Sequence, residues 1–218
     1  REQDVYMVGC PRIDLVSDIL NDDVANLAQS LNEGVGDKIN IQEPFILLSQ
    51  HPVTTEYGES EKQITMTLEA IRKTNLPAII LWPNADAGSE DIARGMRVWR
   101  EKGLDKKMHF YKNLPIDNYV TLMKKTSCLI GNSSSGIREG AFIGTPVVNI
   151  GSRQDNRERG KNVLDVNYNK EMIFNALKKQ INHGSYAFEP IYGDGTAGKQ
   201  IAEILSKCEW KIQKSISY

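Results

Sequence analysis

Three consecutive hydroxyl side chains follow a short apolar run in the segment GNSSSGIREG, residues 131–140. A turn rich in serine and glycine ahead of a helix presents unpaired N–H groups and the positive end of the helix dipole, and both favour an anion. The expected members of this turn are Ser133, Ser134 and Ser135, whose hydroxyls can donate to phosphate oxygens, and Gly136, which has no side chain to block them. The segment predicts a phosphate seat, although an N-capping serine cluster without a ligand would show the same spacing.

A carboxylate follows the serines one helical turn later. Glu139 could accept hydrogen bonds from a ribose diol while a diphosphate occupies the helix end. The serines are not followed by GK[ST], and the segment lacks GxGxxG, so it is neither a Walker loop nor a dinucleotide fingerprint. The pattern therefore favours a nucleoside diphosphate bound by a different motif.

The elements that would position these groups alternate between strands and helices. Apolar runs typical of buried strands are FILLSQ (45–50), PAIILWPN (77–84), HFYKNL (109–114), SCLIGN (127–132), PVVNIG (146–151) and NVLDV (162–166). Helices are predicted at 59–74, 89–103 with Ser89 as the cap, 115–125, from about 136, 169–182 and 196–212, and over most of the first forty residues. This alternation predicts an α/β fold, a doubly wound, Rossmann-like parallel sheet with helices on both faces.

Side chains that would cover a sheet poorly follow five of these strands. They are His51, then Asn84 with Asp86, then Leu114 with Pro115, then the serines, and finally Arg153 with Arg157. In an open parallel sheet, ligands bind beyond the carboxyl ends of the strands. Any one such loop is ordinary, since strand-end loops are usually polar, but five together predict a shared cleft.

Bulk composition narrows the classes of partner. The chain has 218 residues, 40% hydrophobic content and a formal net charge of -1, so it can bury a full core and lacks the positive excess expected for nucleic acid or anionic membranes. No apolar run approaches the roughly 20 residues needed to span a bilayer, and no secretory signal is seen. The odd set Cys10, Cys128 and Cys208 lacks metal-ligand spacing, which favours reduced thiols in a cytoplasm and no metal site.

The serine segment and GTPVVNIGSRQDNRERGKNVLDV (144–166) together resemble the carboxyl-terminal half of the hydrolysing UDP-N-acetylglucosamine 2-epimerases, particularly the branch that feeds sialic acid and related nonulosonate synthesis. The likeness covers nearly the whole chain, in the order GCPRID, QHPVTTE, LWPNADAGS, NLPIDNY and IYGDGTAGKQI. The family has two nucleotide-sugar-transferase-like (GT-B) Rossmann domains. The resemblance implies that residues 1–218 are the second, UDP-binding domain, and the start at Arg1 fits a segment of a longer protein. The amino-terminal domain, which carries several acidic catalytic groups in the family, would lie outside this chain.

The resemblance also implies a reaction that needs no cofactor. UDP leaves UDP-N-acetylglucosamine to give a glycal, and water then adds to give N-acetylmannosamine with inversion at C2. His51 stands where the family has a functional histidine near the diphosphate, either as a neutral donor or, more effectively, protonated. The alternative is a structural histidine that fixes the turn before Pro52. Arg153, together with Arg157, would stabilise the leaving diphosphate.

Uridine recognition is assigned by the same resemblance. The backbone at Leu114 and Pro115 would contact the uracil edge, while Asn84 and Asp86 line the cleft. As a full-length protein the chain would be a homo-oligomer acting on a small-molecule UDP-sugar. The other two histidines, His109 and His183, lie outside the matched motifs and are expected at the surface.

Departures from the wider family leave the sugar open. Many epimerases of the bacterial cell-wall branch carry a doubled glycine where this chain has Ser135-Gly136, and a doubled acid where it has Glu139-Gly140. The serine-rich version resembles the sialic-acid branch, but relatives acting on UDP-diacetamido-trideoxyhexose in legionaminate synthesis look much the same in this half. A GT-B glycosyltransferase and a binding module without chemistry are two further classes of function that the sequence leaves open. We expect the isolated chain to be inactive.

Overall fold

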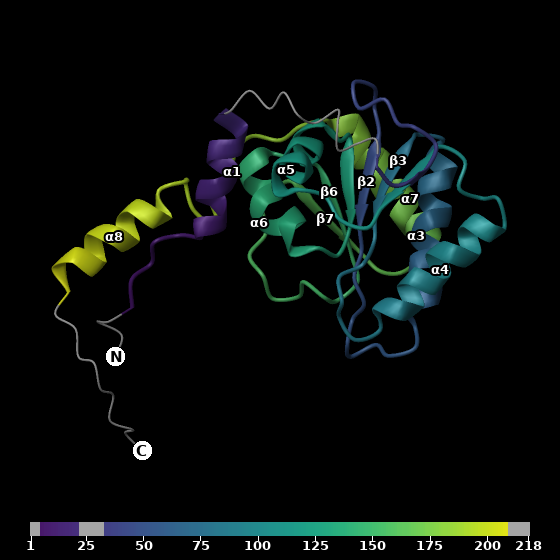
Figure 1. The fold of residues 1–218 in the computed structure, drawn as a ribbon, viewed down its shortest axis with the longest axis horizontal. Helices are drawn as coiled ribbons and strands as arrows, with labels where there is room; N and C mark the ends of the chain where they lie inside the picture. Colours follow the sequence, from purple (N-terminus) through teal and green to yellow (C-terminus); the bar gives the residue numbers. More distant parts are fainter. Residues whose placement is uncertain (1–4, 22–32, 209–218) are drawn as a thin grey trace, which may run out of the picture.

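The computed structural model describes residues 5–21 and 33–208, which form a seven-stranded sheet in the order β1-β4-β3-β2-β5-β6-β7 (Figure 1). The strands are β1 (Val35–Gly36), β2 (Ile46–Ser49), β3 (Ala78–Leu81), β4 (Met108–Tyr111), β5 (Cys128–Gly131), β6 (Val147–Ile150) and β7 (Val163–Val166). All neighbours pair in parallel except β1, which runs antiparallel along β4. The prediction of a doubly wound parallel sheet is confirmed.

Helices cover both faces of this sheet, because successive residues of each strand point to opposite sides. On β2, Leu48 packs among residues of α3 (Ser60–Thr74), α4 (Ser89–Glu101) and α7 (Lys170–His183). The preceding residue, Leu47, packs instead with α5 (Ile116–Lys125), and α6 (Ser134–Ile143) and α1 (Pro11–Asn21) lie on the same side. The runs are apolar on consecutive residues because neither face of the sheet is left to solvent.

The strand order places a topological switch between β2 and β5. From β2 the chain moves through β3 to β4 on one side, and then returns to build β5, β6 and β7 on the other. At such a switch the loops after the two central strands diverge to opposite faces, which leaves a crevice at the carboxyl edge of the sheet. The loop that begins with His51 and the serine turn are the two loops that border this crevice.

Several predicted boundaries need correction. The helix of the serine segment begins at Ser134 rather than near residue 136. Gly88, with φ 89°, is the N-cap of α4, so Ser89 is its first helical residue and not its cap. Residues 11–21 are helical as predicted, but 33–40 contain β1 instead of a helix, and 22–32 lie outside the described residues.

His109 contradicts the expectation that it lies at the surface. It is buried in β4, and its Nδ1 and Nε2 atoms lie 2.9 Å from the main-chain carbonyl oxygens of Asp37 and Glu33 respectively. It therefore fastens the β1 segment to the sheet edge. His183 is exposed, as expected.

The last described helix, α8 (Ala197–Lys207), extends away from the body of the domain (Figure 1). Its N-terminal N–H groups are capped from α1, because Ala197 and Gly198 donate to the Asp14 carboxylate at 3.1 and 2.6 Å. Only Ala197 of this helix is buried. The predicted extension of this helix to residues 209–212 lies outside the described residues. Within the described part of the chain, no helix combines the length and apolar character that crossing a membrane would require.

Candidate functional site

The serine turn is shaped by a glycine at the end of β5. Gly131 has φ 130°, and a Cβ atom there would clash with the Ser49 carbonyl oxygen of the neighbouring strand. The chain then turns, and Ser133 becomes the N-cap of α6, its Oγ accepting from the Ser135 N–H at 3.4 Å. The hydroxyls of these two serines lie 2.9 Å apart. The turn thus places several hydroxyl groups at the positive end of α6, which favours an anion.

Gly136 has a different role from the one predicted. A Cβ atom on this residue would lie 2.9 Å from Val147 Cγ1 and 3.3 Å from Leu129 Cδ2, so the residue faces the sheet. Its lack of a side chain lets α6 pack closely on β5 and β6. The prediction that it clears a path for phosphate is wrong.

His51 is buried directly beyond the end of β2. Its Nδ1 lies 3.3 Å from the main-chain nitrogen of Asn84, which donates to it. Because Nδ1 accepts a hydrogen bond, the neutral ring carries its proton on Nε2, which lies 3.4 Å from Ser49 Oγ. Burial, reinforced by the Arg153 guanidinium and opposed by Asp86, lowers the pKa of His51 from 6.5 to about 4. Of the two forms considered from the sequence, the structure favours the neutral N–H donor.

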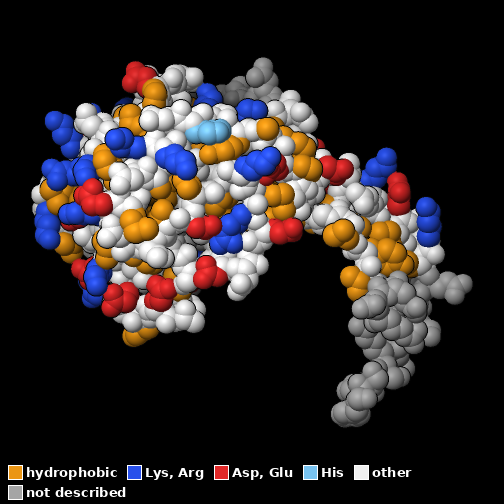
Figure 2. Space-filling view, turned by 180° about the vertical axis from the view of Figure 1, so that it is seen from behind, with side chains coloured by type: hydrophobic (Ala, Val, Ile, Leu, Met, Phe, Trp, Pro, Cys, Tyr) orange, Lys and Arg blue, Asp and Glu red, His pale blue; other side chains and the backbone are white. Residues whose placement is uncertain are grey.

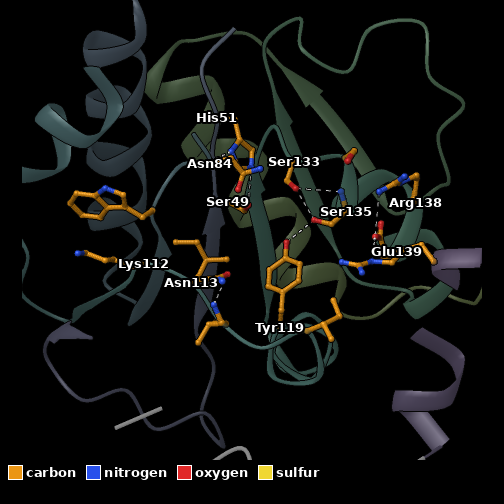
Figure 3. A pocket seen from close by; sticks show the side chains of 16 residues that line it. Ser49, His51, Asn84, Lys112, Asn113, Tyr119, Ser133, Ser135, Arg138 and Glu139 are labelled. Atoms are coloured by element: carbon orange, nitrogen blue, oxygen red, sulfur yellow. Dashed lines mark hydrogen bonds and ion pairs between the residues drawn. The ribbon is translucent and has the colours of Figure 1, made fainter. Parts of the chain in front are cut away.

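A tyrosine extends the group of hydroxyls at the serine turn. The Tyr119 hydroxyl, on α5, lies 2.6 Å from Ser135 Oγ. Burial raises the pKa of Tyr119, so the phenol stays protonated and can donate. Hydrogen bonds therefore connect the hydroxyls of Tyr119, Ser135 and Ser133 at the helix end, and a separate contact joins Ser49 to the His51 imidazole (Figure 3).

Glu139 is buried beside the same turn, although one of its oxygens is not satisfied. Oε1 accepts from Arg12 Nε at 3.4 Å and from Arg138 Nη2 at 3.5 Å. Oε2 has no hydrogen-bond partner among the described residues. A buried acceptor without a donor is costly. The arrangement suits a ligand that brings hydroxyl donors to this carboxylate.

These groups line one cavity of about 300 Å³ at the switch between β2 and β5 (Figure 3). Of the residues predicted for the cleft, the lining contains His51, Asn84, Leu114, Ser133, Ser134, Ser135 and Glu139. Lining residues that the sequence reasoning missed include Arg12, Ser49, Trp82, Lys112, Asn113, Tyr119 and Arg138. Ser49, Lys112 and Asn113 stand at strand ends and had a usable signal, whereas Tyr119 lies within a helix and had none.

The remaining predicted residues lie outside this lining. Arg153 is close behind it, donating to the Asn132 carbonyl at 3.3 Å and pairing with Asp86 at 3.5 Å. Pro115 is the N-cap of α5, next to the lining residue Leu114. Arg157 is exposed and does not reach the cavity, so its proposed contact with the diphosphate is not supported by its position.

Comparison with known proteins adds a family to this geometry. The model of the UDP-N-acetylglucosamine 2-epimerase family matches residues 1–206. The chain belongs to this family. The similar curated members include the hydrolysing UDP-N,N'-diacetylbacillosamine 2-epimerase of Legionella pneumophila, 28% identical over 205 residues that make up 94% of this chain and 52% of that protein. The UDP-N-acetylglucosamine 2-epimerase of Neisseria meningitidis is 25% identical over 97% of this chain and 54% of its own length.

Solved structures of family members share the fold. The N. meningitidis UDP-N-acetylglucosamine 2-epimerase, crystallised with UDP-N-acetylglucosamine, superposes with a TM-score of 0.74 at 18% identity, covering 95% of this chain and 57% of the enzyme. The Methanocaldococcus jannaschii epimerase, in complex with UDP-N-acetylglucosamine and UDP, gives a TM-score of 0.70 at 18% identity over 94% of this chain and 56% of that enzyme. The chain thus spans about half the length of the relatives it matches.

Proposed function

We propose that this chain is the UDP-binding half of a hydrolysing UDP-N-acetylglucosamine 2-epimerase with a two-domain GT-B architecture. The observation that carries the proposal is the cavity at the strand switch, where the serine turn, the His51 imidazole and the unsatisfied Glu139 oxygen meet. A nucleoside diphosphate has hydroxyls for the carboxylate and charged oxygens for the helix end. Membership of the UDP-N-acetylglucosamine 2-epimerase family and the match to about half the length of its relatives support the proposal.

The proposed reaction has two steps. In the first, the anomeric C1–O bond breaks with its electron pair leaving on UDP, and a base removes the C2 proton to give a glycal. In the second, water adds its oxygen to C1 while a proton reaches C2 on the opposite face, which gives N-acetylmannosamine. The sum is one UDP-N-acetylglucosamine and one water converted to one N-acetylmannosamine and one UDP.

In this scheme the chain stabilises the leaving diphosphate. Ser133 and Ser134 donate to its oxygens at the positive end of α6, and His51 donates through Nε2–H. The negative charge on the bridging oxygen grows as the C1–O bond breaks, so a fixed donor lowers the barrier most where it is already aimed at that oxygen. Arg153 adds positive potential from behind His51. The base and acid that act at C2 are assigned to the other half of the enzyme.

The other half of the enzyme would also cover exposed apolar side chains on α8 and on the segment before α1. Val5, Tyr6 and Met7 are exposed, as is Leu205 on α8. Figure 2 shows hydrophobic side chains on the part of the molecule that extends away from the domain. Exposed apolar patches of this kind mark surfaces that contact another domain or protein. We propose that the first GT-B domain packs against these exposed side chains. We also propose that the whole protein forms a homo-oligomer and is located in the cytoplasm.

A second sugar is supported by a specific observation. The 28% identical relative from L. pneumophila is named for UDP-N,N'-diacetylbacillosamine, a diacetamido-trideoxyhexose, and not for UDP-N-acetylglucosamine. Its product would enter the legionaminate branch of nonulosonate synthesis and not the sialic-acid branch. The substituents at C4 and C6 that distinguish the two sugars lie far from the diphosphate, so the serine turn would serve either substrate.

Turnover by the whole protein tests these assignments. The full-length enzyme is incubated with each UDP-sugar in the absence of any acceptor, and the products are followed by proton NMR. Release of free N-acetylmannosamine and UDP supports the epimerase, and preferential release of the diacetamido sugar identifies the second substrate. Product formation only when an acceptor sugar is added would instead identify a glycosyltransferase. The 218-residue chain alone should bind UDP but release none from either sugar, because the groups that act at C2 are elsewhere.

A further inference from the structure

Asn132 stands at the junction of the loops that carry the candidate site, although it does not line the cavity. It is fully buried at the end of β5, immediately before the serine turn. Its main-chain N–H donates to the Ser49 carbonyl oxygen at 3.2 Å, which continues the pairing of β5 with β2 by one residue. Its side chain and carbonyl then make contacts with three further loops.

The Asn132 carboxamide pairs with the main chain of His51 on both sides. The His51 N–H donates to Oδ1 at 2.7 Å, and Nδ2 donates to the His51 carbonyl oxygen at 2.8 Å. This double pairing fixes the orientation of the amide, since the opposite orientation would place two donors and two acceptors face to face. Only a carboxamide can act as donor and acceptor at once in this way. Aspartate lacks the donor, and serine cannot reach both groups.

The remaining contacts of Asn132 reach the loops after β6 and β7. Its carbonyl oxygen accepts from Arg153 Nη1 at 3.3 Å and from Gln154 Nε2 at 2.8 Å, while Nδ2 also lies 3.4 Å from the Tyr168 hydroxyl. The loops after four neighbouring strands thus meet at one buried residue, the loop after β6 through its main-chain carbonyl and the loops after β2 and β7 through its side chain.

We propose that Asn132 is a positioning residue for the diphosphate site, which sets the His51 ring and the Arg153 guanidinium relative to the serine turn. The imidazole receives its own second restraint from the Asn84 N–H at Nδ1. With its main chain held by Asn132 and its ring held by Asn84, His51 presents Nε2–H in one direction before any ligand arrives. Preorganised donors of this kind need no reorganisation when charge develops opposite them. The expected effect of Asn132 on UDP binding rests on the proposed function, whereas its effect on the His51 ring does not.

The test uses the 218-residue chain with Asn132→Asp and Asn132→Ser. The matched control is Gln180→Glu on α7, because Gln180 is equally buried and its amide donates to two main-chain carbonyls, those of Val147 and Asn162, at 2.6 and 2.8 Å. Gln180 does not line the cavity. Both Asp and Glu variants lose an amide donor and gain a buried carboxyl, so a merely structural role affects them alike.

The first readout needs no ligand. Nitrogen-15 NMR of histidine-labelled chain at pH 7 reports the tautomer of His51, and we expect Nε2–H in the wild type and in the Gln180 variant. In the Asn132 variants we expect a mixture of tautomers, because the loop no longer holds Nδ1 against the Asn84 N–H. An unchanged single tautomer in a folded Asn132→Asp chain overturns the proposal. If neither Asn132 variant folds, the exchange rate of the Asn132 side-chain amide protons in the wild-type chain is measured instead. We expect slow exchange, and exchange as fast as that of a free amide would contradict the proposal.

The second readout is the affinity for UDP and for uridine by calorimetry. We expect Asn132→Asp to weaken UDP about tenfold or more, the loss of roughly one charge-assisted hydrogen bond, and uridine about twofold at most. The Gln180 variant should keep the wild-type ratio of the two affinities. An equal loss of UDP affinity in Asn132→Asp and Gln180→Glu would show that Asn132 has only a structural role and would contradict the proposal. If the wild-type chain binds no UDP, the proposed function fails, whereas the tautomer comparison still decides the role of Asn132.

Discussion

Replacing Glu139 by glutamine should weaken UDP binding chiefly through the ribose. The carboxylate is buried. Its Oε1 atom accepts hydrogen bonds from Arg12 and Arg138, while its Oε2 atom has no hydrogen-bond donor among the described residues. Glutamine keeps the shape of the side chain but offers a donor where Oε2 offers an acceptor. One or both hydroxyls of the ribose then lose a charged acceptor, which costs ~1.5–3 kcal/mol.

A second effect acts in the opposite direction. Glutamine leaves both arginines without their carboxylate, so their positive charge acts more fully on the diphosphate. The Arg12 side chain is 43% exposed, and pairs of that exposure contribute only ~0–1 kcal/mol. The ribose effect is larger, so the net loss is ~0.5–3 kcal/mol and UDP should bind roughly 2- to 150-fold more weakly to the variant.

A double-mutant cycle separates these two effects. Affinities of wild-type chain and Glu139→Gln are measured by calorimetry for UDP and for 2',3'-dideoxy-UDP, which lacks the diol but keeps the diphosphate. The arginine effect is common to both ligands and cancels, and we expect a coupling energy of about 1.5 kcal/mol or more. The control is Glu171→Gln, an exposed glutamate that pairs with Lys73 on the outside of α7 and should show no coupling.

A coupling energy below ~0.5 kcal/mol in a folded Glu139 variant would refute the contact between Glu139 and the ribose, since independent sites add within that error. Tighter binding of both ligands by the variant would show that Glu139 only repels the diphosphate. In either case the ribose would have to lie elsewhere in the cavity.

Three further perturbations have defined outcomes. The pKa of His51 falls from 6.5 to about 4 on folding, so between these pH values the unfolded chain binds a proton that the folded chain does not. The free energy of unfolding should therefore drop by up to ~3 kcal/mol as the pH falls from 6.5 to 4. Urea titrations should find this dependence in the wild type and not in a folded His51→Asn variant. Replacing Ser133 and Ser134 by alanine should weaken UDP at least ~10-fold but uridine little, by calorimetry, because the lost donors face the phosphates; equal losses would argue against a phosphate seat. Gly131→Ala should destabilise the fold by ~3 kcal/mol or more in thermal unfolding, because its Cβ would clash with the Ser49 carbonyl oxygen, and an unchanged melting temperature would contradict the φ of 130°.

The layout of this protein follows closely from its sequence. Consecutive apolar residues in runs such as 45–50 and 127–132 indicate strands buried on both faces, and the alternating helices require parallel pairing. Because ligands bind beyond the carboxyl ends of such strands, His51 and the serine turn could be assigned to one cleft before their contacts were known. Glu139 could be added because one helical turn separates it from Ser135.

Other features depend on which strands become neighbours. β2 and β5 are far apart in the chain, and only their adjacency brings the Asn132 carboxamide to the main chain of His51, 81 positions away. The neighbouring strand β3 places the Asn84 N–H at His51 Nδ1, and this contact together with burial makes His51 a neutral Nε2–H donor. Tyr119 enters the site from α5, and Arg157, which follows a strand end in the sequence, is exposed and lies outside the cavity lining. Spacing along the chain fixes the period of each element and the residue at its end, but side-chain contacts between elements are set by strand order and helix packing, which local propensities do not encode.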